Sequence, residues 1–312
     1  MDIRYLRSRP ISEKARREKF QYKHRFEPVF ADSTCMQQAM NFVRQVAPFH
    51  SVVLLYGDHG TGKTFLASKI HELSDRCSEP FLCVNCRWID EQILRPLLFG
   101  TRIAEHHRSG LFQSAHKGTI LLKNIDYLSK SLQSDILKVI QDRSFVPVGG
   151  NERQVFSARI MATMIRTPGH YMAGAEFQRD FYYRISVFPI RVGSLLERKQ
   201  DFKKLVIFFL NNELQKRGLG SVKIPDRFWF ILSSHNWSGN VAELRSVLES
   251  VSTQVLPQDD MVLLKHLPVN ISLLYENNQF SRISSNYDPY SPFKQDQIGI
   301  IPKLKINDGI PI

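Results

Sequence analysis

Short apolar runs alternate with segments of helical periodicity through the middle of the chain. Four runs predict buried strands: Val52–Tyr56, Phe81–Val84, Thr119–Leu122 and Arg159–Met164. Between them, Thr64–Leu73 and Leu132–Ile140 keep their apolar residues on one helical face, which predicts amphipathic helices. Strands that alternate with helices are typical of a parallel sheet with helices on both faces. The pattern therefore predicts an α/β fold.

After about Gly193 the strand-like runs stop and only helical spacing remains. Three segments show it: Leu205–Leu214, Asp226–Ser233 and Val241–Val251. They predict a small all-helical domain behind the sheet. We therefore expect four parts, which are a basic N-terminal arm (1–25), an α/β domain (26–193), a helical domain (194–269) and a mostly irregular C-terminal extension (270–312).

Charge is concentrated at the start of the chain. The protein has 312 residues with 42 Lys and Arg against 30 Asp and Glu, a net charge of +12. Residues 1–25 carry nine of the basic and three of the acidic residues, which is half of that surplus. A basic arm of this kind attracts polyanions, and a solvated tail that aids solubility explains it equally well.

The composition also bears on where the protein works. With 43% hydrophobic and 23% charged residues it has the make-up of a folded protein. Its apolar runs are far shorter than the ~18 residues of a membrane helix, and its first 25 residues are too charged for an export signal. Four cysteines are too few for a disulfide scaffold. We therefore expect a cytoplasmic protein without a membrane contact.

The strongest motif is Gly57-Asp58-His59-Gly60-Thr61-Gly62-Lys63-Thr64, a complete G-x-x-x-x-G-K-T match. It follows the predicted strand Val52–Tyr56 and opens the predicted helix Thr64–Leu73. Its glycines let backbone N–H groups point inward, and the helix N-terminus adds about half a positive charge. Lys63 is expected to reach the β- and γ-phosphates, and the Thr64 hydroxyl is a potential Mg²⁺ ligand. These eight residues are thus predicted to bind a nucleotide.

Further motifs lie on both sides of this loop, between about Phe26 and Pro268. In chain order they are Leu54-Leu55-Tyr56-Gly57, Ile70-His71-Glu72-Leu73-Ser74, the segments 80–86, 98–100, 110–115, 148–150, 180–185 and 187–190, and Trp237-Ser238-Gly239-Asn240-Val241. Together they resemble the AAA+ domain of bacterial sigma-54-dependent transcription activators, the enhancer-binding proteins. The resemblance implies a P-loop NTPase sheet with helices on both faces and a helical lid domain. It also implies assembly into a ring with ATP at the subunit boundaries.

The residues that the family uses to hydrolyse ATP are largely replaced. In the family, one strand ends in an Asp that holds Mg²⁺ and a Glu that prepares the attacking water, whereas here it ends in Lys123 and Asn124. A lysine repels Mg²⁺, and an asparagine cannot accept a proton as a general base. Asp126 is the nearest carboxylate. In an extended chain it would point to the opposite face from Lys123, so we do not expect it to substitute.

Other family positions differ as well. Ile165 replaces a sensing Asn, and Ala242 replaces the lid arginine that senses the γ-phosphate. Of two arginines that reach across the subunit boundary, the first aligns with Gln178 and the second is kept as Arg184. The loop that touches sigma-54 is shortened to 101–109 and lacks the family's Gly-Ala-Phe-Thr-Gly-Ala motif.

These replacements favour ATP binding over hydrolysis, since one arginine finger alone contributes about 10³–10⁵ in rate. We therefore predict an ATP-binding transcription regulator whose hydrolysis is impaired or lost and which acts through nucleotide-dependent assembly or partner binding. Its partners would be copies of itself or AAA+ relatives, with Arg184 acting in a neighbour's site, and sigma-54 RNA polymerase. We hypothesise that Lys123 supplies part of the metal's charge, so that ATP binds with little dependence on Mg²⁺.

Two other interpretations stay open. One is an active ATPase that remodels sigma-54 RNA polymerase, which the missing carboxylates and contact loop oppose. The other is a nucleic-acid-binding protein that uses its basic arm. For that one, the sequence after Pro268 offers no helix-turn-helix pattern, and DNA contact rests on the arm alone.

Overall fold

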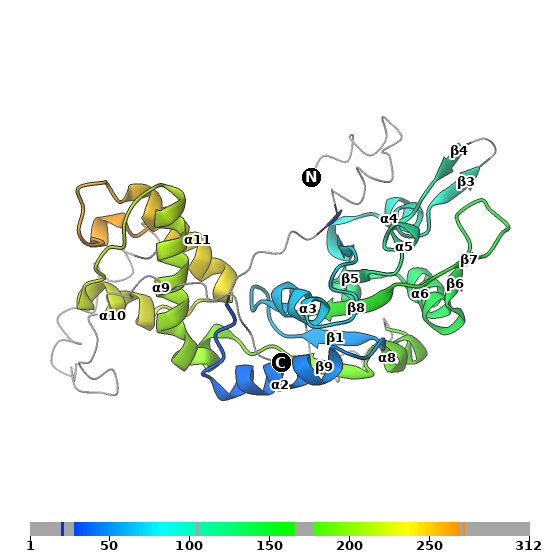
Figure 1. The fold of residues 1–312 in the computed structure, drawn as a ribbon, viewed down its shortest axis with the longest axis horizontal. Helices are drawn as coiled ribbons and strands as arrows, with labels where there is room; N and C mark the ends of the chain where they lie inside the picture. The colour runs from blue at the N-terminus through cyan, green and yellow to red at the C-terminus, as the bar shows by residue number, and fades with distance from the viewer. Residues whose placement is uncertain (1–19, 22–27, 104–105, 166–176, 269–270, 272–312) are drawn as a thin grey trace.

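The protein consists of a sheet-containing lobe and a helical lobe (Figure 1). The structure is a computed structural model that describes residues 20–21, 28–103, 106–165, 177–268 and 271. The predicted basic arm and C-terminal extension lie almost wholly outside the described residues, so both stay predictions.

A five-stranded parallel sheet forms the centre of the larger lobe, in the order β2-β5-β8-β1-β9. Its strands are β1 (Val53–Tyr56), β2 (Phe81–Asn85), β5 (Thr119–Lys123), β8 (Arg159–Met164) and β9 (Phe188–Arg191). The first four are the strands predicted from apolar runs. The edge strand β9 was not predicted, because only Ile190 of its residues is buried and Pro189 interrupts the pattern. A proline is tolerated there because an edge strand has a free side.

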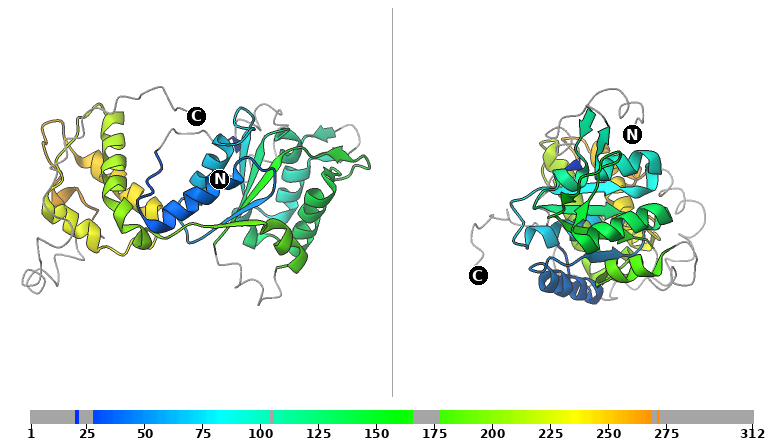
Figure 2. Two further views of the ribbon diagram at one scale, coloured as in Figure 1. Left: turned by 60° about the horizontal axis from the view of Figure 1, so that its bottom comes forward. Right: turned by 90° about the vertical axis from the view of Figure 1, so that its right-hand side faces the viewer.

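Helices cover both faces of the sheet, which confirms the predicted α/β class (Figure 2). Side chains alternate along each strand, so that Val53 and Leu55 face one side and Leu54 faces the other. The first side packs against α2 (Thr34–Val46) and α3 (Lys63–Glu72). The second packs against α4 (Glu91–Phe99), α5 (Leu111–Ser114), α6 (Lys130–Asp142) and α8 (Arg179–Ile185).

Two small hairpins extend from the end of the sheet lobe that lies away from the helical lobe (Figure 1). Strands β3 (Thr101–Ile103) and β4 (His106–Arg108) pair antiparallel where the sequence predicted a shortened loop. Strands β6 (Ser144–Phe145) and β7 (Gln154–Val155) form the second hairpin. A β-bridge between Thr101 and Val148 joins the two, so this end of the lobe is one connected unit.

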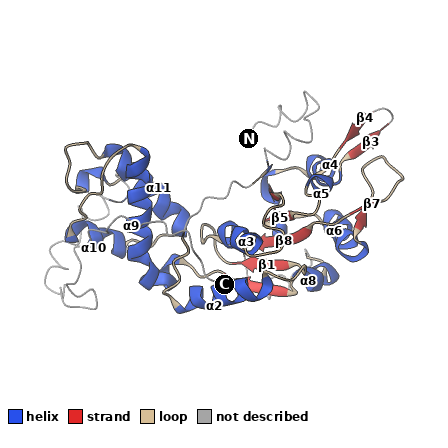
Figure 3. Ribbon diagram, viewed as in Figure 1, coloured by secondary structure: helices blue, strands red, loops and turns tan. Residues whose placement is uncertain are grey.

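The helical lobe contains the three helices that periodicity predicted, and no strand is drawn in it within the described residues (Figure 3). They are α9 (Lys199–Lys216), α10 (Asp226–Ser234) and α11 (Asn240–Gln254). Their apolar faces form a core of their own, which includes Phe228, Trp237 and Leu248. Within the part of the chain that the structure describes, no helix is both long and apolar enough to cross a bilayer.

Candidate functional site

The phosphate loop lies between β1 and α3, where the motif predicted it. Gly57, Gly60 and Gly62 all adopt positive φ angles of 144°, 73° and 102°, a region that side chains other than glycine enter only at a cost. Gly62 directly precedes α3, and the Thr61 hydroxyl donates to the Asp58 carbonyl at 2.9 Å. The glycine-rich loop thus leads directly into the positive N-terminal end of α3, which is the arrangement that binds phosphate groups.

Lys63 is folded onto its own loop. Its Nζ donates hydrogen bonds of 2.6 Å to the carbonyls of Gly57 and Asp58, and the residue is 8% exposed. Burial lowers the pKa of the ammonium from 10.5 to about 8, against the opposing effect of the Asp58 and Asp126 carboxylates, and Lys123 lowers it further. A polyphosphate bound in the loop would supply the negative charge that this buried cation lacks.

The helical lobe contacts the same loop directly. The Asn240 side chain donates to the His59 carbonyl at 2.8 Å, and the Ala242 backbone N–H donates to the Gly60 carbonyl at 3.2 Å. A Cβ added to Gly60 would lie 2.0 Å from the Gly239 carbonyl oxygen, so only glycine fits this approach. Ala242 therefore stands over the phosphate loop, at the place where the resemblance puts a γ-phosphate-sensing arginine.

A buried ion pair fixes the joint between the lobes. Asp201, which is fully buried, accepts hydrogen bonds from the Ser33 backbone N–H and hydroxyl and from Arg198 Nε, at 3.2, 2.6 and 3.3 Å. Arg198 also donates to the Thr61 carbonyl of the phosphate loop at 3.4 Å. One network thus connects the start of α2, the start of α9 and the loop.

The end of β5, beside the loop, carries Lys123 and Asn124. The Asn124 backbone N–H donates to Thr163 Oγ1 of β8 at 3.1 Å, and its side-chain amide donates to Asn85 Oδ1 at 2.8 Å. Both bonds hold a neutral amide at the position where the family has its water-activating Glu. Within the described residues, no ion pair neutralises the Lys123 ammonium.

The expectation that the chain stays extended from Lys123 to Asp126 was wrong. Asn124 adopts a left-handed conformation with φ of 56°, and residues Ile125–Tyr127 form a 3₁₀ turn, so the chain does not stay extended beyond Lys123. The turn brings the Asp126 carboxylate close enough to raise the pKa of Lys63 and of the Cys86 thiol. Asp126 therefore lies within electrostatic range of Lys63 in the phosphate loop.

These donors fit a nucleoside triphosphate better than they fit Mg²⁺. Inward N–H groups, the α3 N-terminus, Lys63 and Lys123 all attract phosphate oxygens. For Mg²⁺ the site offers the Thr64 hydroxyl and the Asp126 carboxylate, opposed by the ammonium of Lys123. The donor set that the family uses for the metal is thus not reproduced.

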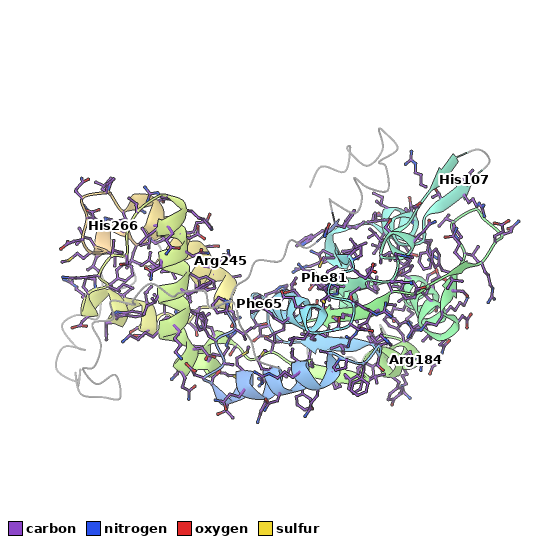
Figure 4. All side chains as sticks on the ribbon, in the orientation of Figure 1. Phe65, Phe81, His107, Arg184, Arg245 and His266 are labelled. Carbon is purple, nitrogen blue, oxygen red and sulfur yellow. The ribbon has the colours of Figure 1, made fainter. Side chains whose placement is uncertain are left out.

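The two positions that the resemblance aligns with inter-subunit arginines, Gln178 and Arg184, differ in their surroundings. Gln178 bonds within its own chain, since its Nε2 donates to the Lys130 carbonyl at 3.2 Å and to Ser134 Oγ at 2.9 Å. Arg184 is exposed in the last turn of α8. Figure 4 places it far from Phe65 on α3, so it does not serve the loop of its own chain. His107 of the shortened contact loop lies at yet another end of the lobe.

One group beside the loop was not foreseen from the sequence. The Arg87 guanidinium lies over the rings of Trp88 and Tyr127 and donates to Nε2 of His59 in the phosphate loop at 3.1 Å. Sequence reasoning missed it because these residues are up to 68 positions apart and match no phosphate-binding motif. The one sequence signal was the adjacent pair Arg87-Trp88 in the turn that follows β2.

Comparisons with protein families and curated proteins agree with this geometry. The family described as "Sigma-54 interaction domain" matches residues 29–191, and the "AAA+ ATPase lid domain" matches residues 196–281. The transcriptional activator RocR of Bacillus subtilis is 32% identical over 78% of this chain and 53% of its own length. The nitrogen assimilation regulatory protein NtrX of Azorhizobium caulinodans is 33% identical over 81% of this chain and 59% of its own length. This chain spans about half the length of the curated relatives it matches.

Solved structures give the same result. The crystal structure of NtrX from Brucella abortus in complex with ATP superposes with a TM-score of 0.72 at 29% identity, over 80% of this chain and 58% of that one. The same protein in complex with ADP matches at the same TM-score of 0.72.

Proposed function

The chain belongs to the sigma-54 interaction domain family of AAA+ transcription activators, and we propose that it binds ATP as a regulatory ligand while its hydrolysis is impaired or lost. Support for ATP binding comes from the phosphate loop, its buried Lys63 and the similar NtrX that was crystallised with ATP and with ADP.

The proposed loss of hydrolysis rests on the two residues at the end of β5, Lys123 and Asn124. An ammonium and a hydrogen-bonded amide stand where the family has its metal-binding and water-activating carboxylates. An ammonium has no lone pair with which to accept a proton, and an amide is not a general base. In the lid, Ala242 stands where the resemblance puts an arginine. Because such groups act as a unit, replacing both carboxylates removes most of the rate that either one supports.

Lys123 also bears on the cofactor. We propose that its ammonium replaces part of the charge of Mg²⁺, so that ATP binds with little dependence on the metal. Asp126 opposes this role, because its carboxylate lies within electrostatic range of Lys63 and is a potential metal ligand. An ATP affinity that changes less than about threefold when EDTA replaces Mg²⁺ supports this role of Lys123. A strict Mg²⁺ requirement for binding refutes it.

We propose that the regulator acts by assembly, as a homo-oligomer or with AAA+ relatives. Arg184 supports this, because it is exposed and distant from its own phosphate loop. It could thus reach a neighbour's nucleotide while its own site stays inactive. The proposed target is sigma-54 RNA polymerase in the cytoplasm, which the chain would influence by joining, capping or inhibiting a ring made of active relatives.

The decisive experiment measures ATP binding and ATP turnover on one preparation. We expect submillimolar binding, turnover near the background of the Lys63→Ala variant, and loss of binding in that variant. The double variant Lys123→Asp/Asn124→Glu restores both carboxylates, and we expect it to raise turnover above the unmodified chain. Turnover in the unmodified chain well above that of Lys63→Ala would refute the loss of hydrolysis.

Asp126 favours a second candidate, an active ATPase that uses this carboxylate in place of the missing pair. Its electrostatic influence on the Lys63 ammonium is the structural observation that favours this candidate. The variant Asp126→Asn distinguishes the two functions. If the unmodified chain hydrolyses ATP and Asp126→Asn does not, the second candidate is correct. If turnover is absent from both proteins while both bind ATP, the first is correct.

A further inference from the structure

Arg87 lies beside the phosphate loop, where neighbouring side chains hold its guanidinium. Its guanidinium carbon lies 4.6 Å from the centre of the Trp88 ring and 4.9 Å from the centre of the Tyr127 ring. Its Nη1 donates to Nε2 of His59 at 3.1 Å, so this nitrogen of His59 is the acceptor of a neutral ring. Two aromatic faces and one loop side chain therefore fix the guanidinium in place.

The elements that carry this cluster follow neighbouring strands of the sheet. Arg87 and Trp88 belong to the 3₁₀ turn Cys86–Trp88 after β2, and Tyr127 ends the 3₁₀ turn after β5. Asn85 ties the two turns together, because its Oδ1 accepts from the Arg87 backbone N–H at 3.2 Å and from the Asn124 amide at 2.8 Å. Ligands of α/β proteins bind beyond the carboxyl ends of such strands.

The guanidinium has no anionic partner among the residues that the structure describes. Its one side-chain hydrogen bond goes to a neutral imidazole, and its remaining N–H groups are available. Arg191 and Arg198, in contrast, each form an ion pair with a carboxylate, that of Glu197 and of Asp201 respectively. A guanidinium that is held rigid but left without an anion is prepared to bind one, since less side-chain entropy is lost on binding.

We propose that Arg87 binds the terminal phosphate of ATP in its own chain and gives the site a preference for nucleoside triphosphates over diphosphates. This inference rests on the proposed function, because it requires that a nucleotide occupies the loop. The loop N–H groups and the α3 N-terminus surround the inner phosphates. Arg87 follows Asn85, which pairs with Lys123 at the end of β5, so it lies beyond the carboxyl ends of these two strands. We expect the outermost phosphate of ATP to extend toward this position and the shorter diphosphate not to reach it.

The cluster also contains a fluorescent reporter, the Trp88 ring. Trp88 is 72% exposed and Tyr127 is 46% exposed, so both rings border on solvent while they hold the arginine. A phosphate that binds the guanidinium brings negative charge beside the Trp88 ring and neutralises the cation that lies over it. The emission of Trp88 should therefore respond to ATP and not to ADP. The two other tryptophans are Trp229 and the buried Trp237 in the helical lobe.

The first test compares the affinities of the full chain for ATP and for ADP by calorimetry in EDTA. We expect Arg87→Ala to weaken ATP binding by about tenfold to a hundredfold, as for one lost hydrogen-bonded charge pair, and to change ADP binding by less than about twofold. Arg87→Lys should lose part of the preference, because it keeps the charge without the fork. Arg153→Ala is the matched control, since it removes an exposed arginine on the β6–β7 hairpin and should leave both affinities unchanged.

The second test is tryptophan emission on titration with each nucleotide. We expect ATP to change the emission of the unmodified chain, and we expect this change to vanish in both Arg87→Ala and Trp88→Phe. Equal losses of ATP and ADP affinity in Arg87→Ala would overturn the inference, because Arg87 would then only support the loop. Equal ATP and ADP affinities in the unmodified chain would overturn it while the proposed function stands. Failure of the unmodified chain to bind any nucleotide would overturn both.

Discussion

The low pKa of Lys63 predicts that ATP binding weakens as the pH rises above about 8. In the free protein the ammonium is buried against two backbone carbonyls, and burial is the main reason that its pKa falls to about 8. A bound triphosphate places negative charge beside Nζ and returns the pKa toward its ordinary value. Binding above this pKa therefore requires the uptake of a proton.

The size of the effect follows from linkage. Each unit by which the pH exceeds the pKa of the free protein weakens binding by about tenfold, until the pKa of the bound state is reached. Between about pH 7 and about pH 9 the dissociation constant should rise by about tenfold. The free energy of unfolding of the nucleotide-free protein should instead increase with pH. The unfolded chain keeps the Lys63 proton up to a higher pH than the folded chain does. The contribution of Lys63 to the free energy of unfolding therefore rises between about pH 8 and the ordinary lysine pKa.

Isothermal titration calorimetry at several pH values measures both quantities. Near pH 8.5 the binding enthalpy should differ between two buffers with different ionisation enthalpies, because the bound proton comes from the buffer. The variant Lys63→Met keeps the apolar stem without the charge, so its residual affinity should lose this pH dependence. A flat dissociation constant and a buffer-independent enthalpy in the unmodified chain would refute the reasoning.

Three further substitutions test the scaffold of the site. Asp201→Ala breaks the buried network with Ser33 and should lower the free energy of unfolding by about 3–5 kcal/mol in urea titrations; an effect below about 1 kcal/mol would contradict the burial argument. Gly60→Ala forces a methyl group against the Gly239 carbonyl and should weaken ATP binding at least tenfold in the same calorimetry, so an unchanged affinity would show that the loop is not held by the lid. Arg159→Ala removes a guanidinium that donates to three backbone carbonyls and is 1% exposed, and should cost about 3 kcal/mol of stability; an unchanged thermal midpoint would count against it.

Much of the fold was predictable from the sequence because the sheet is buried on both faces. Strands such as β8, in which every residue is buried, leave a largely apolar run, and the glycine-rich turn after β1 marks the phosphate loop. The elements that were missed lack such a signal. The hairpin of β3 and β4 is short and polar, so its pairing depends on a neighbouring segment through the bridge from Thr101 to Val148.

The site was predictable only where a local motif defines it. The loop residues follow from one contiguous pattern, whereas Asp126 and Arg87 depend on backbone turns after two strands. For Asp126 the cause is a single residue, since Asn124 enters the left-handed region that asparagine tolerates better than most residues. For Arg87 the cause is distance along the chain, because its contact with His59 joins positions 28 residues apart.

The contact between the lid and the phosphate loop has a consequence for how this sequence can change. Ala242 reaches Gly60 through its main-chain N–H, and Gly239 approaches through its carbonyl oxygen. Every amino acid except proline supplies that N–H, so the attachment does not depend on which side chain occupies position 242. A substitution at position 242, proline excepted, can therefore occur without the loss of this bond between lid and loop. The side chain at this position and the attachment of the lid can thus vary independently.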